Sequence, residues 1–191
     1  MNWNGETIVD LERRFLGTNG VRVVVDAKVV DKDVTLPEER QTSAETLEAD
    51  TLEVLADLNH ASQKGLQTIF DSSVGRSTVN HPLGGRYQIT PTEASVQKLP
   101  VQHGVTTTAS VMAQGFNPYV AEWSPYHGAA YAVIEATARL VAAGANWSKA
   151  RFSYQEYFER MDKQAERFGQ PVAALLGSIE AQIQLGLPSI G

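Results

Sequence analysis

The sequence predicts an α+β fold. Runs rich in β-branched residues are interspersed with runs whose apolar residues follow helical spacing, and the two kinds do not alternate strictly. This order is typical of an α+β protein or of a mixed sheet covered by helices. With 191 residues and a hydrophobic fraction of 42%, the chain is long enough for one domain, or for one domain with an appendage.

The first third of the chain is predicted to contain one strand and two helices. The β-branched run 21–30 is typical of a strand. A helix is expected over 42–58, because Thr42 and Glu45 have the spacing of a capping box, which satisfies free N–H groups of a first turn. A shorter helix is expected to follow over 61–70.

The middle of the chain is predicted to form short strands. Strands are expected over 73–79, 95–101 and 104–115, where Val and Thr are frequent. The glycine-containing run 82–87, between the first two strands, is expected to form a turn.

The longest helix is predicted to run from Ser124 to about Ala143. Ser124 has a side chain suited to an N-cap, and Pro125 occupies the first helical position, where its missing N–H costs nothing. Gly144 is expected to end this helix.

The C-terminal part of the chain is predicted to add a strand and then further helices. The run 149–158 is expected to be a strand that leads into a helix. Two helices are expected over 159–169 and 171–186, and residues 187–191 are expected to start another strand.

Composition excludes several classes of function. The net charge of −6 argues against a nucleic-acid-binding surface, which needs clustered Lys and Arg. The absence of cysteine excludes a disulfide, a cysteine-ligated zinc and a cysteine nucleophile from this chain. The N-terminus has no basic-then-apolar signal region, and no apolar run approaches the ~20 residues of a membrane span, so we expect a cytoplasmic protein without a membrane partner.

Short motifs give little evidence of chemistry. The sequence contains no phosphate loop, dinucleotide-binding fingerprint or nucleophile elbow. Gly75 and Arg76 are candidates for a phosphate contact, and the alternative interpretation is a strand with a solvated arginine. No two histidines have the i,i+4 spacing of a helical metal site; they are His60, His81, His103 and His127.

One carboxylate, Glu135, lies inside the long alanine-rich helix, and Arg139 follows it by one turn. At this spacing the two residues form a pair worth about 0.2–0.5 kcal/mol on an exposed helix. The alternative is a divalent cation held by Glu135, because hard cations take oxygen ligands. The spacing alone favours the ion pair.

Five segments together resemble one enzyme family. They are DSSVGRSTV, YQITPTEASVQKLPV, VTTTASVMAQGFNPYVAEWSPYHGAAYAVIEATARLVAAGAN, RFSYQEYF and LGLPSIG. In this order and spacing they resemble phosphoribosylformylglycinamidine synthase, the ATP-dependent glutamine amidotransferase of purine biosynthesis. The resemblance runs from about Trp3 to Gly191 and is densest from Asp71 onward.

The resemblance implies a specific fold. The synthetase region of this family has two halves, each resembling an aminoimidazole ribonucleotide synthetase, and the chain resembles the N-terminal domain of the second half. That domain has a mainly antiparallel half-barrel sheet with helices on one face, here preceded by a helical linker. Residues 1–35 would be the tail of a preceding domain with a linker, 36–70 the helical linker, and 71–191 the synthetase domain, truncated at its C-terminal end.

The resemblance also implies sites for magnesium and ATP. Glu135 matches a carboxylate that helps to bind the magnesium of a nucleotide in an auxiliary site of many large family members. Arg139 and His103 stand where those members have their other two ligands from this domain. We therefore expect this metal site to be degraded, with Arg139 neutralising Glu135; the alternative is that Arg139 binds a phosphate directly.

Four further residues are implied in nucleotide binding. Ser153 matches the position at which smaller members place an ATP-contacting Asp, and Gln155 lies beside it. Their alternative interpretation is as polar residues at the end of a strand. Gly191 directly precedes the position of the family's glycine-rich nucleotide loop, and Arg76 is the fourth candidate.

The implied function belongs to the intact protein. That protein converts formylglycinamide ribonucleotide, glutamine and ATP to formylglycinamidine ribonucleotide. Its glutaminase uses a cysteine, so the first synthetase half and a glutaminase domain would be partners of this chain, and the isolated chain is expected to be inactive. The alternative is a non-catalytic pairing module that completes the synthetase core and forms a homodimer through its exposed sheet. A synthetase relative acting alone is disfavoured because the C-terminal domain is missing.

Overall fold

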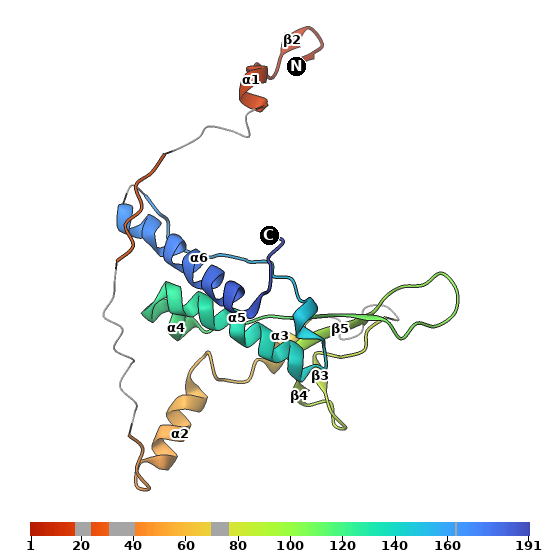
Figure 1. The fold of residues 1–191 in the computed structure, drawn as a ribbon, viewed down its shortest axis with the longest axis vertical. Helices are drawn as coiled ribbons and strands as arrows, with labels where there is room; N and C mark the ends of the chain where they lie inside the picture. The colour runs from red at the N-terminus through yellow and green to blue at the C-terminus, as the bar shows by residue number, and fades with distance from the viewer. Residues whose placement is uncertain (18–23, 31–40, 70–76, 163) are drawn as a thin grey trace.

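The computed structural model describes residues 1–17, 24–30, 41–69, 77–162 and 164–191. Within these ranges the protein is a mixed α+β structure, as predicted, with small antiparallel two-stranded sheets and a few helices (Figure 1). The helices are α1 (Arg13–Leu16), α2 (Leu47–Ala56), α3 (Lys64–Gln67), α4 (Pro118–Trp123), α5 (Pro125–Ala142) and α6 (Ala165–Leu185), with a 3-10 turn at Trp147–Lys149. The strands are β1 (Asn2–Trp3), β2 (Glu6–Thr7), β3 (Leu83–Gly84), β4 (Thr90–Pro91), β5 (Ala94–Lys98) and β6 (Ala109–Ala113).

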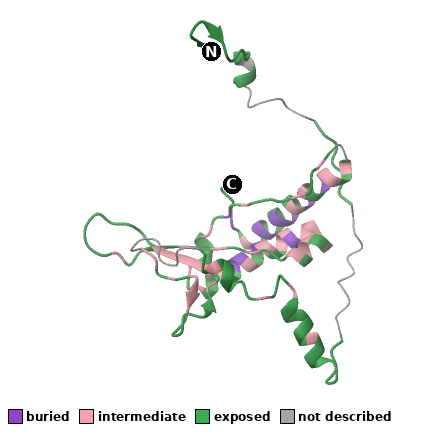
Figure 2. Ribbon diagram, turned by 180° about the vertical axis from the view of Figure 1, so that it is seen from behind, coloured by how far each residue is buried: buried purple, intermediate pink, exposed green. Residues whose placement is uncertain are grey.

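Helices α5 and α6 lie side by side and hold most of the buried residues (Figure 2). Val133 on α5 is the most deeply buried large side chain among the described residues, with 1% of its surface exposed. The segments on either side of α6 complete the core with one aromatic and one aliphatic side chain. The core cluster is Val133, Ala136, Phe152, Ala181 and Leu187.

Small residues let α6 approach α5 closely. A Cβ atom at Gly177 would lie 2.0 Å from the Tyr126 carbonyl oxygen, so the two helices could not keep this distance with any other residue there. The buried face of α6 consists of Gly169, Ala173, Gly177, Ser178, Ala181 and Gln182. This face has the i,i+4 spacing of one helical ridge.

The sheet formed by β5 and β6 lies next to α5. Its register is antiparallel and pairs Val96 with Val111. Directly after β6, the chain passes so close to α5 that a Cβ at Gly115 would lie 2.1 Å from the Ala132 carbonyl oxygen. On the other side of β5, Thr78 forms an isolated antiparallel bridge with Gln97.

The long central helix was predicted correctly. The Ser124 side chain accepts a hydrogen bond from the His127 backbone N–H, and Pro125 occupies the first turn of α5. The helix ends at Ala142, and Gly144 follows with a left-handed φ of 81°. The strands predicted over 95–101 and 104–115 correspond to β5 and β6, both shorter than expected.

The predictions for the first third of the chain were confirmed in part: α2 forms inside the range expected for a helix over 42–58, and α3 inside 61–70. The strand expected over 21–30 does not form within its described residues, 24–30; the Lys28 N–H instead donates to the Ala165 carbonyl at the start of α6, 2.8 Å away. The predicted capping box does not form. The turn before α2 is closed instead by Ser43 and Thr46, each of whose backbone N–H groups donates to the other's hydroxyl, at 3.0 and 3.3 Å.

Three further elements are shorter or differently arranged than predicted. Only 64–67 of the helix expected over 61–70 forms, and Gly65 lowers its helix propensity. The expected strand 149–158 is reduced to one parallel bridge between Phe152 and Ser189. The two helices expected over 159–186 are a single helix, α6, which continues through Pro171. The proline lies in the second turn, where it removes only one helical hydrogen bond.

Several predictions fall outside the described residues. These are the linker boundaries at 35 and 70 and most of the strand predicted over 73–79. Among the described residues, no helix is long and apolar enough to cross a membrane.

Candidate functional site

Two segments far apart in the sequence pair at the C-terminal end of the chain. The Phe152 N–H donates to the Pro188 carbonyl at 3.0 Å, and the Ile190 N–H donates to the Phe152 carbonyl at 2.8 Å. The Tyr154 N–H then donates to the Gly191 carbonyl at 2.9 Å. The two segments therefore run parallel, and their carboxyl ends lie together.

This pairing brings together two of the residues predicted to bind nucleotide. A Cβ built on Gly191 would lie 3.9 Å from the Ser153 hydroxyl oxygen. Because side chains alternate in extended chain, Ser153 and Gln155 belong to one face of the segment. Both are exposed, whereas Phe152 is buried.

The opposite face of the segment anchors it to the core. Phe152 and Tyr154 stack with ring centroids 6.1 Å apart, and Phe152 packs in the core cluster. The Tyr154 hydroxyl is buried and has no hydrogen-bond partner among the described residues, since the nearby Ser178 hydroxyl donates to the Leu175 carbonyl. Burial raises the pKa of Tyr154, so this hydroxyl stays neutral.

The exposed face offers hydrogen-bonding groups, and by the same alternation the exposed Arg151 belongs to it. A serine hydroxyl, a glutamine amide and the backbone around a glycine are suited to bind the ribose or phosphate of a nucleotide. None of these groups is an acid, a base or a nucleophile activated by a neighbour. The arrangement offers groups that can hold a ligand.

Arg139 forms a second polar cluster, where α5 meets the sheet. Its guanidinium Nη2 lies 2.7 Å from Glu135 Oε1, and its Nη1 donates to the Gln114 carbonyl at 2.9 Å. Its Nε lies 3.4 Å from Glu93 Oε2, directly before β5. The predicted ion pair between Glu135 and Arg139 is therefore present, and Arg139 also connects α5 to both strands.

These residues do not fit a magnesium ion beside Glu135. The second oxygen of Glu135 accepts a hydrogen bond from the Phe116 N–H at 2.8 Å, so both carboxylate oxygens are engaged. The guanidinium of Arg139 would also repel a cation. His103 lies in an exposed turn, and no group of three or more metal-ligating side chains occurs among the residues that the structure describes.

A cavity of about 250 Å³ lies beside Arg139. It is lined by Asn80, Thr92, Glu93, Ala94, Arg139, Ala142 and Ala143. All three guanidinium nitrogens already contact a carboxylate or a carbonyl, and two carboxylates lie near. This charge balance gives no support to the alternative in which Arg139 binds a phosphate directly.

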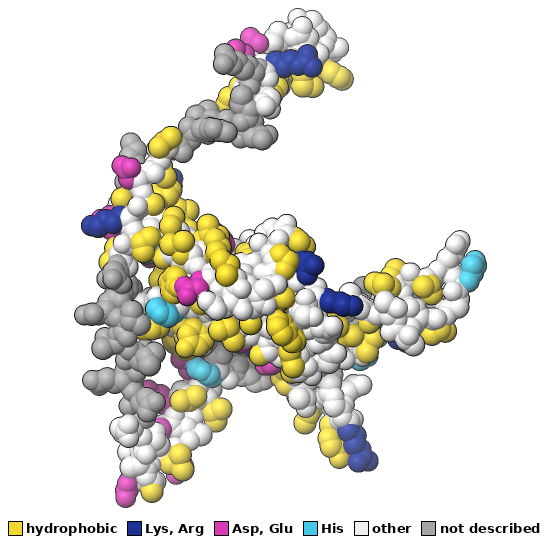
Figure 3. All heavy atoms as spheres, in the orientation of Figure 1, with side chains coloured by type: hydrophobic (Ala, Val, Ile, Leu, Met, Phe, Trp, Pro, Cys, Tyr) yellow, Lys and Arg dark blue, Asp and Glu magenta, His cyan; other side chains and the backbone are white. Residues whose placement is uncertain are grey.

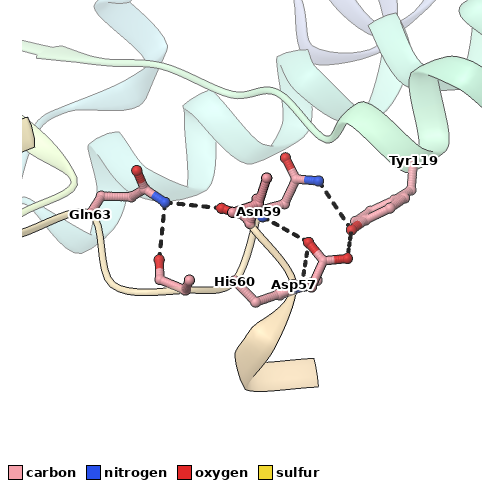
Figure 4. A network of polar contacts seen from close by, with 7 residues as sticks. Asp57, Asn59, His60, Gln63 and Tyr119 are labelled. Atoms are coloured by element: carbon pink, nitrogen blue, oxygen red, sulfur yellow. Dashed lines mark hydrogen bonds and ion pairs between the residues drawn. The ribbon is translucent and has the colours of Figure 1, made fainter. Parts of the chain in front are cut away.

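A third polar cluster, which the sequence did not predict, connects the end of α2 to α4 (Figure 4). The Tyr119 hydroxyl donates to Asp57 Oδ2, and the Asn59 side chain donates to the Tyr119 oxygen at 3.1 Å. The Asn59 N–H donates to Asp57 Oδ1 at 2.7 Å, and the His60 ring stacks on Tyr119 with centroids 5.9 Å apart. We call these four residues, Asp57, Asn59, His60 and Tyr119, the Asp57 clasp.

The clasp perturbs the pKa of its two central groups. The hydrogen bond from Tyr119 lowers the pKa of Asp57, and the Asn59 backbone N–H adds to this effect. The same hydrogen bond raises the pKa of Tyr119, because it favours the neutral phenol. The D-x-N spacing of Asp57 and Asn59 is a recognisable turn signal. The sequence gives no signal that Tyr119, 62 residues away, is the partner of Asp57.

Two remaining candidates take no part in these clusters. Arg76 lies outside the described residues. His127 has a structural role, because its Nδ1 lies 2.8 Å from the capping Ser124 hydroxyl and its ring contacts Trp123 and Tyr126.

No protein-family model, curated protein or solved structure matches the chain.

Proposed function

We propose that the chain is a synthetase domain of an ATP-dependent phosphoribosylformylglycinamidine synthase and that it binds a nucleotide. The observation that carries the proposal is the parallel pairing of 152–154 with 188–191, which places Ser153 beside Gly191. Ligands of α/β proteins commonly bind beyond the carboxyl ends of parallel strands. Two residues chosen from the sequence resemblance meet there, although 38 positions of the chain separate them.

In this proposal the chain holds the nucleotide while other domains supply the remaining groups. Ser153 and Gln155 donate and accept hydrogen bonds, and Gly191 lets the backbone approach a phosphate closely. The reaction uses ATP to activate the amide oxygen of formylglycinamide ribonucleotide, and ammonia from glutamine then displaces the phosphate. The ammonia is released by a cysteine-dependent glutaminase, which must lie in another domain because this chain has no cysteine.

The finer fold belongs to the same proposal. The β5–β6 sheet, with α5 beside it, would be part of a mainly antiparallel half-barrel that pairs with the first synthetase half. The cytoplasmic location expected from the sequence remains a prediction, as does the inactivity of the isolated chain.

Backbone amide NMR tests the nucleotide site directly. Titration with magnesium and ATP is expected to shift the amide signals of 152–155 and 188–191 and to leave those of β1 and β2 unchanged. Shifts confined to the surroundings of Arg139 would contradict the assignment of the site. Turnover of formylglycinamide ribonucleotide by the isolated chain would contradict its role as a binding domain.

A second candidate is a non-catalytic pairing module. The observation in its favour is that few side chains of the described residues are buried. Large apolar side chains lie at the surface instead, such as Met112 with 72% of its surface exposed. Such surface is typical of a protein that associates. Analytical sedimentation tests this function: a monomer that persists at high protein concentration would contradict it, whether or not ATP binds.

A further inference from the structure

The loop of the β1–β2 hairpin consists of an asparagine followed by a glycine. Trp3 pairs with Glu6 across it, so that Asn4 and Gly5 alone connect the two strands. Both loop residues have a left-handed backbone, with a φ of 48° at Asn4 and 88° at Gly5. This is the backbone of a type I′ turn, for which Asn-Gly is the preferred sequence.

The side chain of Asn4 is open to reaction with the residue that follows it. Asn4 and Gly5 are both exposed, and nothing lies within 4 Å of a Cβ built on Gly5. Among the residues that the structure describes, none is hydrogen-bonded to the Asn4 side chain. Figure 3 shows the N-terminal hairpin at the top of the molecule, apart from the helices that form the core.

The hairpin is too small to hold this loop permanently closed. Each strand has two residues, and all residues from 2 to 7 are exposed. A two-stranded hairpin that packs on nothing is at best marginally stable in water, and exposed elements near a terminus open at little cost in free energy. We therefore expect the loop to open often enough for the Asn4 side chain to rotate toward the Gly5 nitrogen.

We propose that Asn4 is a site of spontaneous deamidation. The Gly5 backbone nitrogen loses its proton and attacks Cγ of Asn4. The new Cγ–N bond closes a five-membered succinimide ring, and the Cγ–Nδ2 bond breaks to release ammonia. Water then opens the ring at either carbonyl and leaves aspartate or isoaspartate at this position. The net change is amide plus water to carboxylic acid plus ammonia, so the reaction needs no oxidant and no cofactor.

The two products differ in their effect on the hairpin. Aspartate preserves the turn, because Asp-Gly is also a preferred type I′ sequence. Isoaspartate adds one methylene group to the main chain, so the two-residue turn and the pairing of Trp3 with Glu6 cannot both be kept. Both products add one negative charge to the net charge of −6. The reaction therefore converts part of the protein irreversibly to a form without this hairpin, whether or not the chain binds a nucleotide.

Peptide mapping of the aged chain tests the site. After incubation at neutral pH and denaturation, trypsin cleaves at Arg13 and Arg14 and so separates residues 1–13 from residues 15–22, which contain the second Asn-Gly pair of the chain. Peptide 1–13 is expected to gain the mass that replaces NH₂ by OH, and its fragment spectrum should place the change at Asn4. An isoaspartate methyltransferase with S-adenosylmethionine is expected to label the same peptide.

Three variants separate this reaction from other causes. Asn4→Gln is expected to lose the labelled product, because the attack would have to close a less favourable six-membered ring. Gly5→Ala should slow the reaction about tenfold, because its Cβ obstructs the attacking nitrogen. Alanine is strained at a φ of 88° and opens the turn, which alone would speed the reaction, so a slower rate reports the attack itself. Asn2→Gln is the matched control in the same peptide and should leave the rate unchanged.

Each other outcome would overturn the proposal. An aged wild-type chain whose peptide 1–13 keeps its mass and takes no label would show that Asn4 does not react. A change that persists in Asn4→Gln would place the reaction at Asn2. Equal rates in the wild-type chain and in Gly5→Ala would show that the amide is lost without attack by the Gly5 nitrogen.

Discussion

Arg139 connects three segments through one side chain. Its contacts reach Glu135 on its own helix, the Gln114 carbonyl after β6 and Glu93 before β5. The side chain is 25% exposed, whereas that of Glu93 is 66% exposed, so the contact with Glu93 contributes least. The packing of α5 on the sheet is therefore partly electrostatic.

Replacing Arg139 tests this account. Arg139→Ala leaves the Glu135 carboxylate and the Gln114 carbonyl without their partner and is expected to lower the free energy of unfolding by about 1–2 kcal/mol. Urea denaturation measures the change. Arg151→Ala is the control, since Arg151 bonds only to the nearby Lys149 and Ala150 carbonyls. Equal stability of the two variants would contradict a connecting role for Arg139.

Gly177 tests the close approach of α6 and α5. Gly177→Ala would place a methyl group 2.0 Å from the Tyr126 carbonyl, so the helices must move apart, at an expected loss of about 1–3 kcal/mol in stability. Gly65→Ala is the control, because nothing lies within 4 Å of a Cβ there. That control should be neutral or gain up to about 1 kcal/mol from helix propensity. Thermal unfolding followed by circular dichroism compares them, and a stable Gly177→Ala variant would contradict the described packing.

For individual residues, the sequence predicted only contacts between residues that lie close together in the chain. The Ser124 cap and the pair of Glu135 with Arg139 were predictable because each involves residues within four positions. The contact of Arg139 with Glu93 and that of Tyr119 with Asp57 depend on tertiary folding. No pattern in the intervening residues indicates them.

The contact between α2 and α4, made by the Asp57 clasp, is expected to contribute to stability in a way that depends on pH. The pKa of Asp57 is lowered in the folded chain, so its contribution to stability is present above its unfolded pKa of about 4 and is lost as pH falls through the folded pKa. The pKa of Tyr119 is raised, so its contribution is present below about pH 10 and is lost as pH rises through the folded pKa. We therefore expect the clasp to stabilise the fold less at both extremes of pH.

Tyr119→Phe removes the hydrogen bond that lowers the pKa of Asp57. Removing the hydroxyl is expected to raise the pKa of Asp57 toward its ordinary value, because the largest cause of the shift is lost. Carboxyl carbon NMR of Asp57 during a pH titration measures this. Tyr157→Phe, at an exposed tyrosine, should leave the Asp57 titration unchanged. An identical Asp57 pKa in both variants would show that the clasp does not form in solution.

Helices and strands were predicted where local signals and tertiary packing agree. Helix α5 has a cap, a proline in its first turn and a terminating glycine, and it forms as expected. The run 21–30 has strong strand propensity, yet its described residues, 24–30, pair with no strand among the residues that the structure describes. Two helices were predicted over 159–169 and 171–186, but α6 continues through Pro171, which removes only one helical hydrogen bond.

Across the residues that the structure describes, burial is concentrated in one small region. The core lies between α5, α6 and the pair of segments that carries Ser153 and Gly191, so the candidate nucleotide site lies beside the buried part of the described structure. Apolar surface elsewhere is exposed, most fully at residues outside the helices such as Val24 and Val105. The composition predicted an adequate core, but it could not show that many apolar residues would remain at the surface.

The central claim is that the paired segments 152–154 and 188–191 bind a nucleotide. Isothermal titration calorimetry with magnesium and ATP, comparing the wild-type chain with Ser153→Val, tests it most directly; Ser110→Val, on the exposed part of β6, is the control. Loss of one hydrogen bond to the ligand is expected to weaken ATP binding by roughly 3–10-fold in Ser153→Val and not in Ser110→Val. Equal affinity of all three proteins, or no binding to the folded wild-type chain, would contradict the claim.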